Sequence, residues 1–180
     1  MKKQSILLII TLLITGCTSA TKVNTPGFVA PCDQIKLAES AEKSAVLPCL
    51  DGSSEINYHK LKGPLVINVW GSWCEGCKQE MPYFVELYQN PVFKSGQIQM
   101  LGVNVEEKSK EAAITYIQKS GMSWPNLEDT SGISKSIFGP GVPVTWFIDE
   151  NGKNIETKIG AYTNKKQLFN QVEKAFGVKL

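Results

Sequence analysis

The sequence contains no arginine: all 19 basic residues of the 180-residue chain are lysines. Lysine offers a point charge, whereas the planar guanidinium of arginine forms the paired hydrogen bonds with which proteins commonly bind phosphate. The net charge of +2 comes from Lys2 and Lys3, since removing these two leaves 17 lysines against 17 acidic residues. The rest of the chain therefore has no surplus charge to attract an acidic partner, and we expect no nucleic-acid interface.

Histidine is almost absent, because His59 is the only one. A structural zinc site needs four ligands, usually cysteine or histidine side chains from two short turns. Cys74 and Cys77 are separated by two residues and have the spacing of one such half-site, but the other three cysteines are isolated. The sequence therefore predicts no metal site, and His59 is interpreted as a solvated side chain.

The N-terminal apolar run covers only residues 6–14, too few to cross a bilayer as a helix. Two lysines precede this run, so residues 1–16 have the pattern of an export leader. Residues 13–17 (Leu-Ile-Thr-Gly-Cys) resemble the bacterial lipoprotein cleavage box, in which the cysteine is diacylated and becomes the new N-terminus. Cys17 is therefore predicted to anchor the protein, outside the cytoplasm, to the cell membrane. The alternative is an ordinary secretory leader with an unmodified Cys17.

Cys74 and Cys77 lie where a buried strand is expected to give way to a helix. Residues 64–70 form a short apolar run bounded by breakers, and the residues after Cys77 repeat apolar side chains at helical spacing. A cysteine at a helix N-terminus lies beside unpaired backbone N–H groups and the positive end of the helix dipole, which favour the thiolate. Two thiols at this spacing can also close a disulfide across the first helical turn. The pattern indicates thiol–disulfide exchange.

Glu80 lies three residues after Cys77, so the two side chains are expected on one helix face. That face continues through four further apolar positions, Met81, Phe84, Val85 and Tyr88. Apolar surroundings would raise the pKa of Glu80 and allow it to exchange a proton with Cys77. The alternative is a solvated helix glutamate without a catalytic role.

Cys32 and Cys49 are the two cysteines left over. An exported domain meets an oxidising compartment, so a disulfide between them is predicted to staple residues 32–50. The alternatives are two free thiols or exchange with the Cys74–Cys77 pair. Residues 17–31 are small, polar and proline-containing, as expected of a tether, and the folded domain is assigned to residues 32–180.

The rest of the chain alternates strand and helix patterns. Ser109 is a predicted helix N-cap and Gly121 ends that helix. The order predicts a three-layer α/β sandwich around a mixed sheet. Strands are expected near residues 55–57, 64–70, 98–105, 144–148 and 153–160, and helices at 33–47, 77–88, 109–121, 133–138 and from 164 onward.

This order, together with Trp73-Cys74-x-x-Cys77, resembles the thioredoxin fold, a central mixed β-sheet flanked by helices. More specifically, the chain is similar to the membrane-attached TlpA/ResA-like thiol–disulfide oxidoreductases. The likeness covers roughly residues 47–177 and is carried by three separated strings. They are Leu-Lys-Gly-Pro-Leu-Val-Ile-Asn-Val-Trp-Gly-Ser-Trp-Cys at 61–74, Cys-Lys-Gln-Glu-Met-Pro at 77–82, and Gly-Val-Pro-Val-Thr-Trp-Phe-Ile-Asp at 141–149.

The resemblance implies a role for each matching residue. Cys74 would be the exposed nucleophile and Cys77 the resolving thiol, with Trp73 packed beside them. Pro143 matches the family's cis-proline, which faces the cysteine pair and leaves the backbone of Val142 free to pair with an extended substrate. Taken without the resemblance, Pro143 reads as an ordinary trans turn proline.

The family also has a glutamate at the position of Glu80, with a suggested role in proton transfer. One departure concerns Gly76, because relatives usually have proline immediately before the second cysteine. Glycine lacks the fixed φ of proline, so we expect a changed reduction potential, in a direction that the sequence does not decide. Glu75 places a negative charge beside Cys74 and by itself disfavours the thiolate.

The resemblance implies an extracytoplasmic, lipid-anchored enzyme that acts on protein disulfides, a reductase of the apocytochrome c maturation type. Its electrons would come from a membrane thiol donor, its redox group would be the Cys74–Cys77 disulfide without a separate cofactor, and it is expected to be a monomer. Three alternatives have a related fold. A non-catalytic lipid-anchored binding module and a peroxiredoxin-like peroxidase stay open, whereas a Sco-type copper chaperone needs three residues between its cysteines and a distant histidine.

Overall fold

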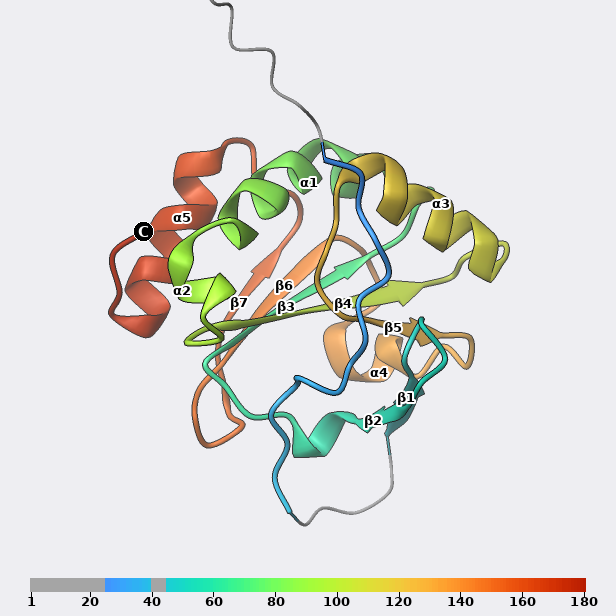
Figure 1. Cartoon of the computed structure of the whole chain (residues 1–180), viewed down its shortest axis with the longest axis horizontal. Helices are drawn as coiled ribbons and strands as arrows, with labels where there is room; N and C mark the ends of the chain where they lie inside the picture. The colour runs from blue at the N-terminus through green and yellow to red at the C-terminus, as the bar shows by residue number, and fades with distance from the viewer. Residues whose placement is uncertain (1–24, 40–44) are drawn as a thin grey trace, which may run out of the picture.

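The computed structural model describes residues 25–39 and 45–180. Its centre is a five-stranded mixed sheet in the order β5-β4-β3-β6-β7 (Figure 1). The strands β3, β4 and β5 run parallel to one another, whereas β6 is antiparallel to both of its neighbours, β3 and β7. The strand bounds are β3 Leu65–Trp70, β4 Gln99–Val105, β5 Asn126–Asp129, β6 Val144–Ile148 and β7 Asn154–Ile159.

Helices cover both faces of this sheet, which confirms the predicted three-layer sandwich. Three of the longer helices lie over one face, and a short helix with a small hairpin lies under the other (Figure 1). The first layer holds α1 Glu75–Tyr88, α3 Lys110–Ser120 and α5 Lys165–Phe176, with the one-turn α2 Pro91–Lys94 at its side; the second holds β1 Val46–Pro48, β2 Glu55–Asn57, the 3-10 turn η1 Tyr58–Lys60 and α4 Ser134–Phe138. None of the helices within the described ranges is long and apolar enough to cross a membrane.

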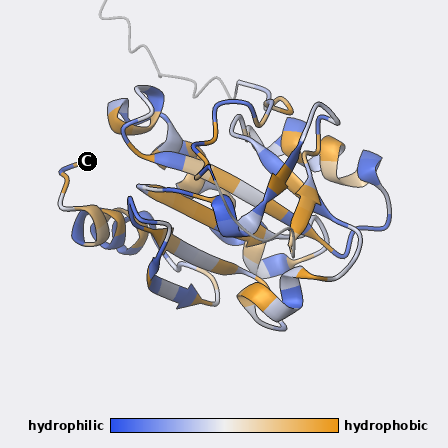
Figure 2. Cartoon of the chain, turned by 90° about the horizontal axis from the view of Figure 1, so that it is seen from below, coloured by the Kyte–Doolittle hydropathy of each residue, from blue (hydrophilic) through white to orange (hydrophobic). Residues whose placement is uncertain are grey.

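The central strand β3 supplies both halves of the core. All six of its residues are buried, and successive side chains point to opposite faces of the sheet. Val66 and Trp70 pack with α1, α3 and α5, whereas Ile67 and Val69 pack toward the hairpin and α4. The hydropathy colouring in Figure 2 shows the same layering, with hydrophobic strands inside and hydrophilic turns outside. Burial on both faces explains why the run at 64–70 reads as continuously apolar.

The helix termini follow the predicted signals. Ser109 Oγ accepts a hydrogen bond from Ala112 N at 3.2 Å and begins α3, which Gly121 ends in the left-handed conformation at φ 86°. Asn164 caps α5 in the same way, and Gly177 ends it at φ 66°. Both glycines adopt the left-handed backbone conformation, which costs other residues energy. This explains why glycine occurs at the ends of these two helices.

The segment before the hairpin packs against the end of α3 and the connection from α3 to β5. Gly27 N donates to Gln118 O at 3.0 Å, and Phe28 N donates to Met122 O at 2.9 Å. Ala30 is buried and forms a parallel bridge to Pro125. Residues 25–31, which the sequence assigned to a tether, are therefore part of the folded body. The export leader, Cys17 and the tether at 17–24 lie outside the described residues.

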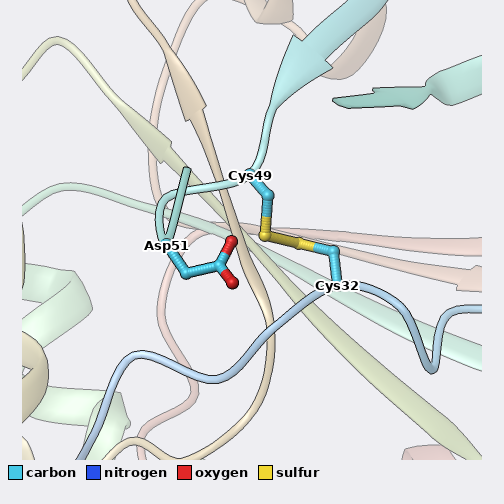
Figure 3. A group of neighbouring side chains, drawn as sticks. All are labelled: Cys32, Cys49 and Asp51. Carbon is cyan, nitrogen blue, oxygen red and sulfur yellow. A yellow bond between two sulfur atoms is a disulfide. The ribbon is translucent and has the colours of Figure 1, made fainter. Parts of the chain in front are cut away.

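A disulfide joins Cys32 to Cys49 and fixes this segment to the hairpin (Figure 3). Both cysteines are buried, and Cys49 also forms an antiparallel bridge to Leu127 of β5. The bond therefore holds the segment around Cys49 against β5, where it pairs with a sheet edge that would otherwise be unpaired. A carboxylate oxygen of Asp51 and the two sulfur atoms all lie within 4.8 Å of one another. The sulfur atoms are bonded to each other and offer no thiolate to a metal, so this cluster reads as structural.

The structure differs from the expected secondary structure in two places. The described residues of 33–47 form turns, isolated bridges and the start of β1 rather than a helix, because Leu37 pairs with Leu61 across the chain. The strand β5 was not expected, since Asn-Leu-Glu-Asp has low strand propensity and forms a strand only by pairing with β4. Trp124, in the connection between α3 and β5, is completely buried in the core.

We predict that the double variant Cys32→Ala/Cys49→Ala unfolds at lower denaturant concentration than the wild type. The bond links residues 17 apart, so on the chain-entropy model its loss costs about 3 kcal/mol of unfolding free energy. Equilibrium urea unfolding followed by tryptophan fluorescence measures this change. An unchanged midpoint would show that the disulfide does not stabilise the fold.

Candidate redox site

The site lies at the junction between the end of β3 and the start of α1. Cys74 and Cys77 form a disulfide across the first turn of the helix. Cys74 is the N-cap residue of α1, and its Sγ accepts a hydrogen bond from Cys77 N at 3.1 Å. Cys74 is 6% exposed and Cys77 is 0% exposed, so any access to the pair from solvent is through Cys74.

Residues 71–73 form the loop before the disulfide, which is held by the end of β4. The Glu107 carboxylate accepts hydrogen bonds from Ser72 N, from Ser72 Oγ at 2.7 Å and from Asn104 Nδ2 at 2.9 Å. Trp73 donates through Nε1 to Val105 O at 3.2 Å, and its ring is still 46% exposed. Sequence reasoning placed Trp73 beside the disulfide but missed Glu107 and Asn104. Their position at the carboxyl end of a strand parallel to β3 was the available signal.

Pro143 lies opposite the first turn of α1. Its peptide bond with Val142 is cis. A Cβ built on Gly76 would lie 3.3 Å from Pro143 Cδ and 3.5 Å from the Ala161 side chain, so these three residues are close neighbours. Pro143 O accepts a hydrogen bond from Gly160 N at 2.9 Å, which fixes the loop before β6 to the end of β7. The structure thus brings Val142 and Pro143 to the cysteine pair although 65 or more residues separate them in sequence.

Glu80 is fully buried one helical turn after Cys77. Its Oε1 accepts a hydrogen bond from Asn68 Nδ2 at 3.1 Å, and its Oε2 accepts one from Tyr162 N at 2.9 Å. Burial raises the pKa of Glu80 from 4.5 to about 7, although the bonds from Tyr162 and Asn68 and the charge of Lys158 lower it. A carboxyl group with a pKa near neutrality can both accept and release a proton at physiological pH.

Sequence reasoning placed Glu80 on the buried face but did not identify the two donors that hold it. Asn68 is completely buried in the middle of β3, and Tyr162 lies far along the chain in the connection between β7 and α5. The polar residue inside an otherwise apolar run was a detectable signal for Asn68. Nothing local marks Tyr162, because it donates through its backbone.

A comparison with known proteins agrees with this geometry. The AhpC/TSA family model matches residues 38–156. The thiol–disulfide oxidoreductase ResA of Bacillus anthracis is 32% identical over 178 residues, which cover 97% of this chain and 98% of that protein. ResA of Bacillus subtilis (strain 168) is 34% identical over 110 residues, which cover 60% of each chain.

Two solved structures share the fold. StoA from Bacillus subtilis has a TM-score of 0.57 and 22% identity, covering 72% of this chain and 96% of its own. A secreted Mycobacterium tuberculosis disulfide oxidoreductase homologous to E. coli DsbE has a TM-score of 0.62 and 19% identity, covering 72% of this chain and 94% of its own. At these identities the likeness establishes the architecture.

We predict that Glu80→Gln removes a pH dependence of stability. A carboxyl group whose pKa rises on folding stabilises the fold fully below its unfolded pKa and loses that contribution as the pH increases through the folded pKa. With 4.5 unfolded and about 7 folded, the wild type should lose roughly 3 kcal/mol relative to Glu80→Gln between about pH 4 and pH 8. Urea unfolding of the oxidised proteins across this range measures the difference, and parallel pH profiles would rule out a raised pKa.

Proposed function

The chain belongs to the AhpC/TSA family as a ResA-like thiol–disulfide oxidoreductase, and we propose that it works as an extracytoplasmic reductase of protein disulfides. The observation that carries this proposal is the unequal burial of the cysteine pair in front of Glu80. Cys74 keeps a small exposed fraction, Cys77 has none, and a carboxyl group with a pKa of about 7 lies one helical turn after Cys77. This arrangement separates attack on a substrate from release of the product.

The reaction begins with the reduced pair. The Cys74 thiolate attacks one sulfur of a substrate disulfide, a mixed disulfide forms, and the other substrate sulfur leaves as a thiolate that takes a proton from water. Glu80 accepts the proton of the Cys77 thiol, and the resulting thiolate attacks Cys74 Sγ. The second substrate thiolate then leaves, so the substrate has gained two electrons and the enzyme holds the Cys74–Cys77 disulfide. The disulfide is itself the redox group, and no other cofactor enters these steps.

The charges around the pair support the reducing direction. A strong oxidant such as DsbA owes its potential to a stabilised reduced form. Here the ionised Glu80 disfavours a thiolate nearby and Cys77 is shielded from water, whereas the charge of Glu75 is paired with Lys78 at 3.6 Å. The Cys77 N–H directed at Cys74 Sγ and the N-terminus of α1 favour a Cys74 thiolate, but both are backbone groups without a full positive charge. The reduced form therefore lacks the stabilisation that an oxidant needs.

The leader and Cys17 support a position at the outer side of the cell membrane. A diacylated Cys17 would be followed by at most seven residues, 18–24, before the folded body, which begins by residue 25. Fully extended, the eight steps along the chain from residue 17 to residue 25 would span about 28 Å, so the folded body would stay close to the membrane. Such a position suits electron delivery by a membrane thiol donor and substrates that mature at the membrane surface, of which apocytochrome c is the class implied by the family.

We predict opposite effects for the two active cysteines. Cys74→Ser should abolish reduction of a protein disulfide such as insulin, because the accessible nucleophile is gone. Cys77→Ser should accumulate a mixed disulfide with the substrate, visible by mass spectrometry, because the second attack cannot occur. Cys32→Ala/Cys49→Ala serves as the control that loses two cysteines and keeps turnover. Full turnover by Cys74→Ser would exclude the proposal.

A separate prediction concerns the anchor. Cys17→Ala should move the protein from the membrane fraction to the soluble extracytoplasmic fraction, and it should lose incorporation of labelled fatty acid. Cys32→Ala, in which a different cysteine is removed, should leave both unchanged. Retention of Cys17→Ala in the membrane would show that the lipid is not what holds the protein there.

A further inference from the structure

A small apolar pocket lies beside the reacting pair. It sits at the carboxyl ends of β3, β4 and β5, and we call the side lined by Val69 and Val105 its floor. Trp73 and Val142, the sequence neighbours of Cys74 and Pro143, also line it, as does Pro140. Its volume is about 40 Å³, and since one water needs at least 10 to 15 Å³, it has room for about three or four atoms.

The pocket is held in shape by hydrogen bonds. The Asp129 carboxylate at its edge accepts bonds from Gly132 N at 2.8 Å and from Ser134 N at 2.7 Å, which fixes the loop before α4. The bond from Trp73 Nε1 to Val105 O holds the indole against the end of β4. A pocket formed before its ligand arrives binds without the cost of ordering its walls.

Three glycines that line the pocket face open space, which we call its opening. A Cβ built on Gly132, Gly139 or Gly141 would meet no atom within 4 Å. Gly132 and Gly139 have φ values of 77° and 100°. This backbone conformation favours glycine and by itself explains why glycine occupies both positions. The backbone of Gly141 does not require glycine in this way. We therefore attribute glycine at this position to the space that the absent side chain leaves. The ion pair between Lys135 and Glu106 lies at the rim.

No charged group in the pocket is left to bind a charged ligand. Glu106 is paired with Lys135, and both oxygens of Asp129 are occupied by donors of its own loop. A charged side chain placed against Val69 and Val105 would lose its water without gaining a partner. An apolar side chain would instead lose only unfavourable contact with water.

We propose that this pocket binds one aliphatic side chain of the substrate, close in sequence to the substrate cysteine, so that the enzyme prefers disulfides flanked by an apolar residue. The inference builds on the proposed function. A substrate segment extended along the backbone of Val142 presents alternate side chains to opposite sides, and the residue on the inner side meets the pocket that Val142 itself lines.

The test uses the reduced full chain and a set of disulfide-bonded peptides. Leucine replaces serine, one position at a time, at the two residues on each side of the cysteine, and kcat/KM is measured for each peptide. At one of these positions leucine should increase kcat/KM about tenfold or more over serine, mainly through a lower KM. Gly141→Val, which fills the opening, should reduce this ratio to near one.

Val105→Ala enlarges the floor and provides a second variant. It should shift the preference at the same position from leucine toward phenylalanine, whereas Val92→Ala, a matched change in α2 away from the pocket, should keep the wild-type ratio. Equal rates on leucine and serine peptides at every position in the wild type would overturn the pocket and leave the proposed function standing. Failure of the wild type to reduce any of the peptides would instead overturn the proposed function.

Discussion

The buried carboxyl group of Glu80 is the constraint on which the site depends. Removing a carboxyl group from water is costly unless donors replace the lost hydration. Here the donors come from two distant parts of the fold, Asn68 in β3 and Tyr162 before α5, so α1 is fixed to both. The same segment that supplies Tyr162 places Ala161 beside Gly76, and Gly160 bonds to Pro143. One set of contacts therefore positions both the proposed proton acceptor and the loop proposed to face the substrate.

The fold separates the reactive cysteines from the structural ones. Cys74 and Cys77 lie at the carboxyl end of the parallel strands, where loops are free to vary and a helix N-terminus is available. Cys32 and Cys49 are buried beside β5, where their bond covers a sheet edge. Neither structural sulfur is accessible, so the second disulfide has no route to a protein substrate. The Cys74–Cys77 and Cys32–Cys49 disulfides are chemically alike, and their different places in the fold give them different roles.

Much of this architecture was predictable from local patterns. The continuous apolar run of β3, the caps Ser109 and Asn164, and the CxxC pair all carry their signal within a few residues. Glu80 was assigned to the buried face because helical spacing places it near Cys77. What escaped prediction depends on contacts between distant segments. The strand β5 has a polar sequence and forms only because β4 pairs with it, and residues 25–31 look like a tether but pack against α3 and the connection before β5. Glu107 and Tyr162 reach the site through bonds that no local pattern encodes.

The reduction potential of the Cys74–Cys77 pair tests the central claim most directly. The full chain would be equilibrated at pH 7 in a graded series of reduced and oxidised dithiothreitol. Thiol labelling followed by mass spectrometry would report Cys74 and Cys77 separately from Cys32 and Cys49. A reductase that accepts electrons from the cytoplasmic side should show a potential near or below that of thioredoxin, roughly −270 mV. A value near −120 mV, typical of DsbA, would make the protein an oxidant and contradict the reducing role.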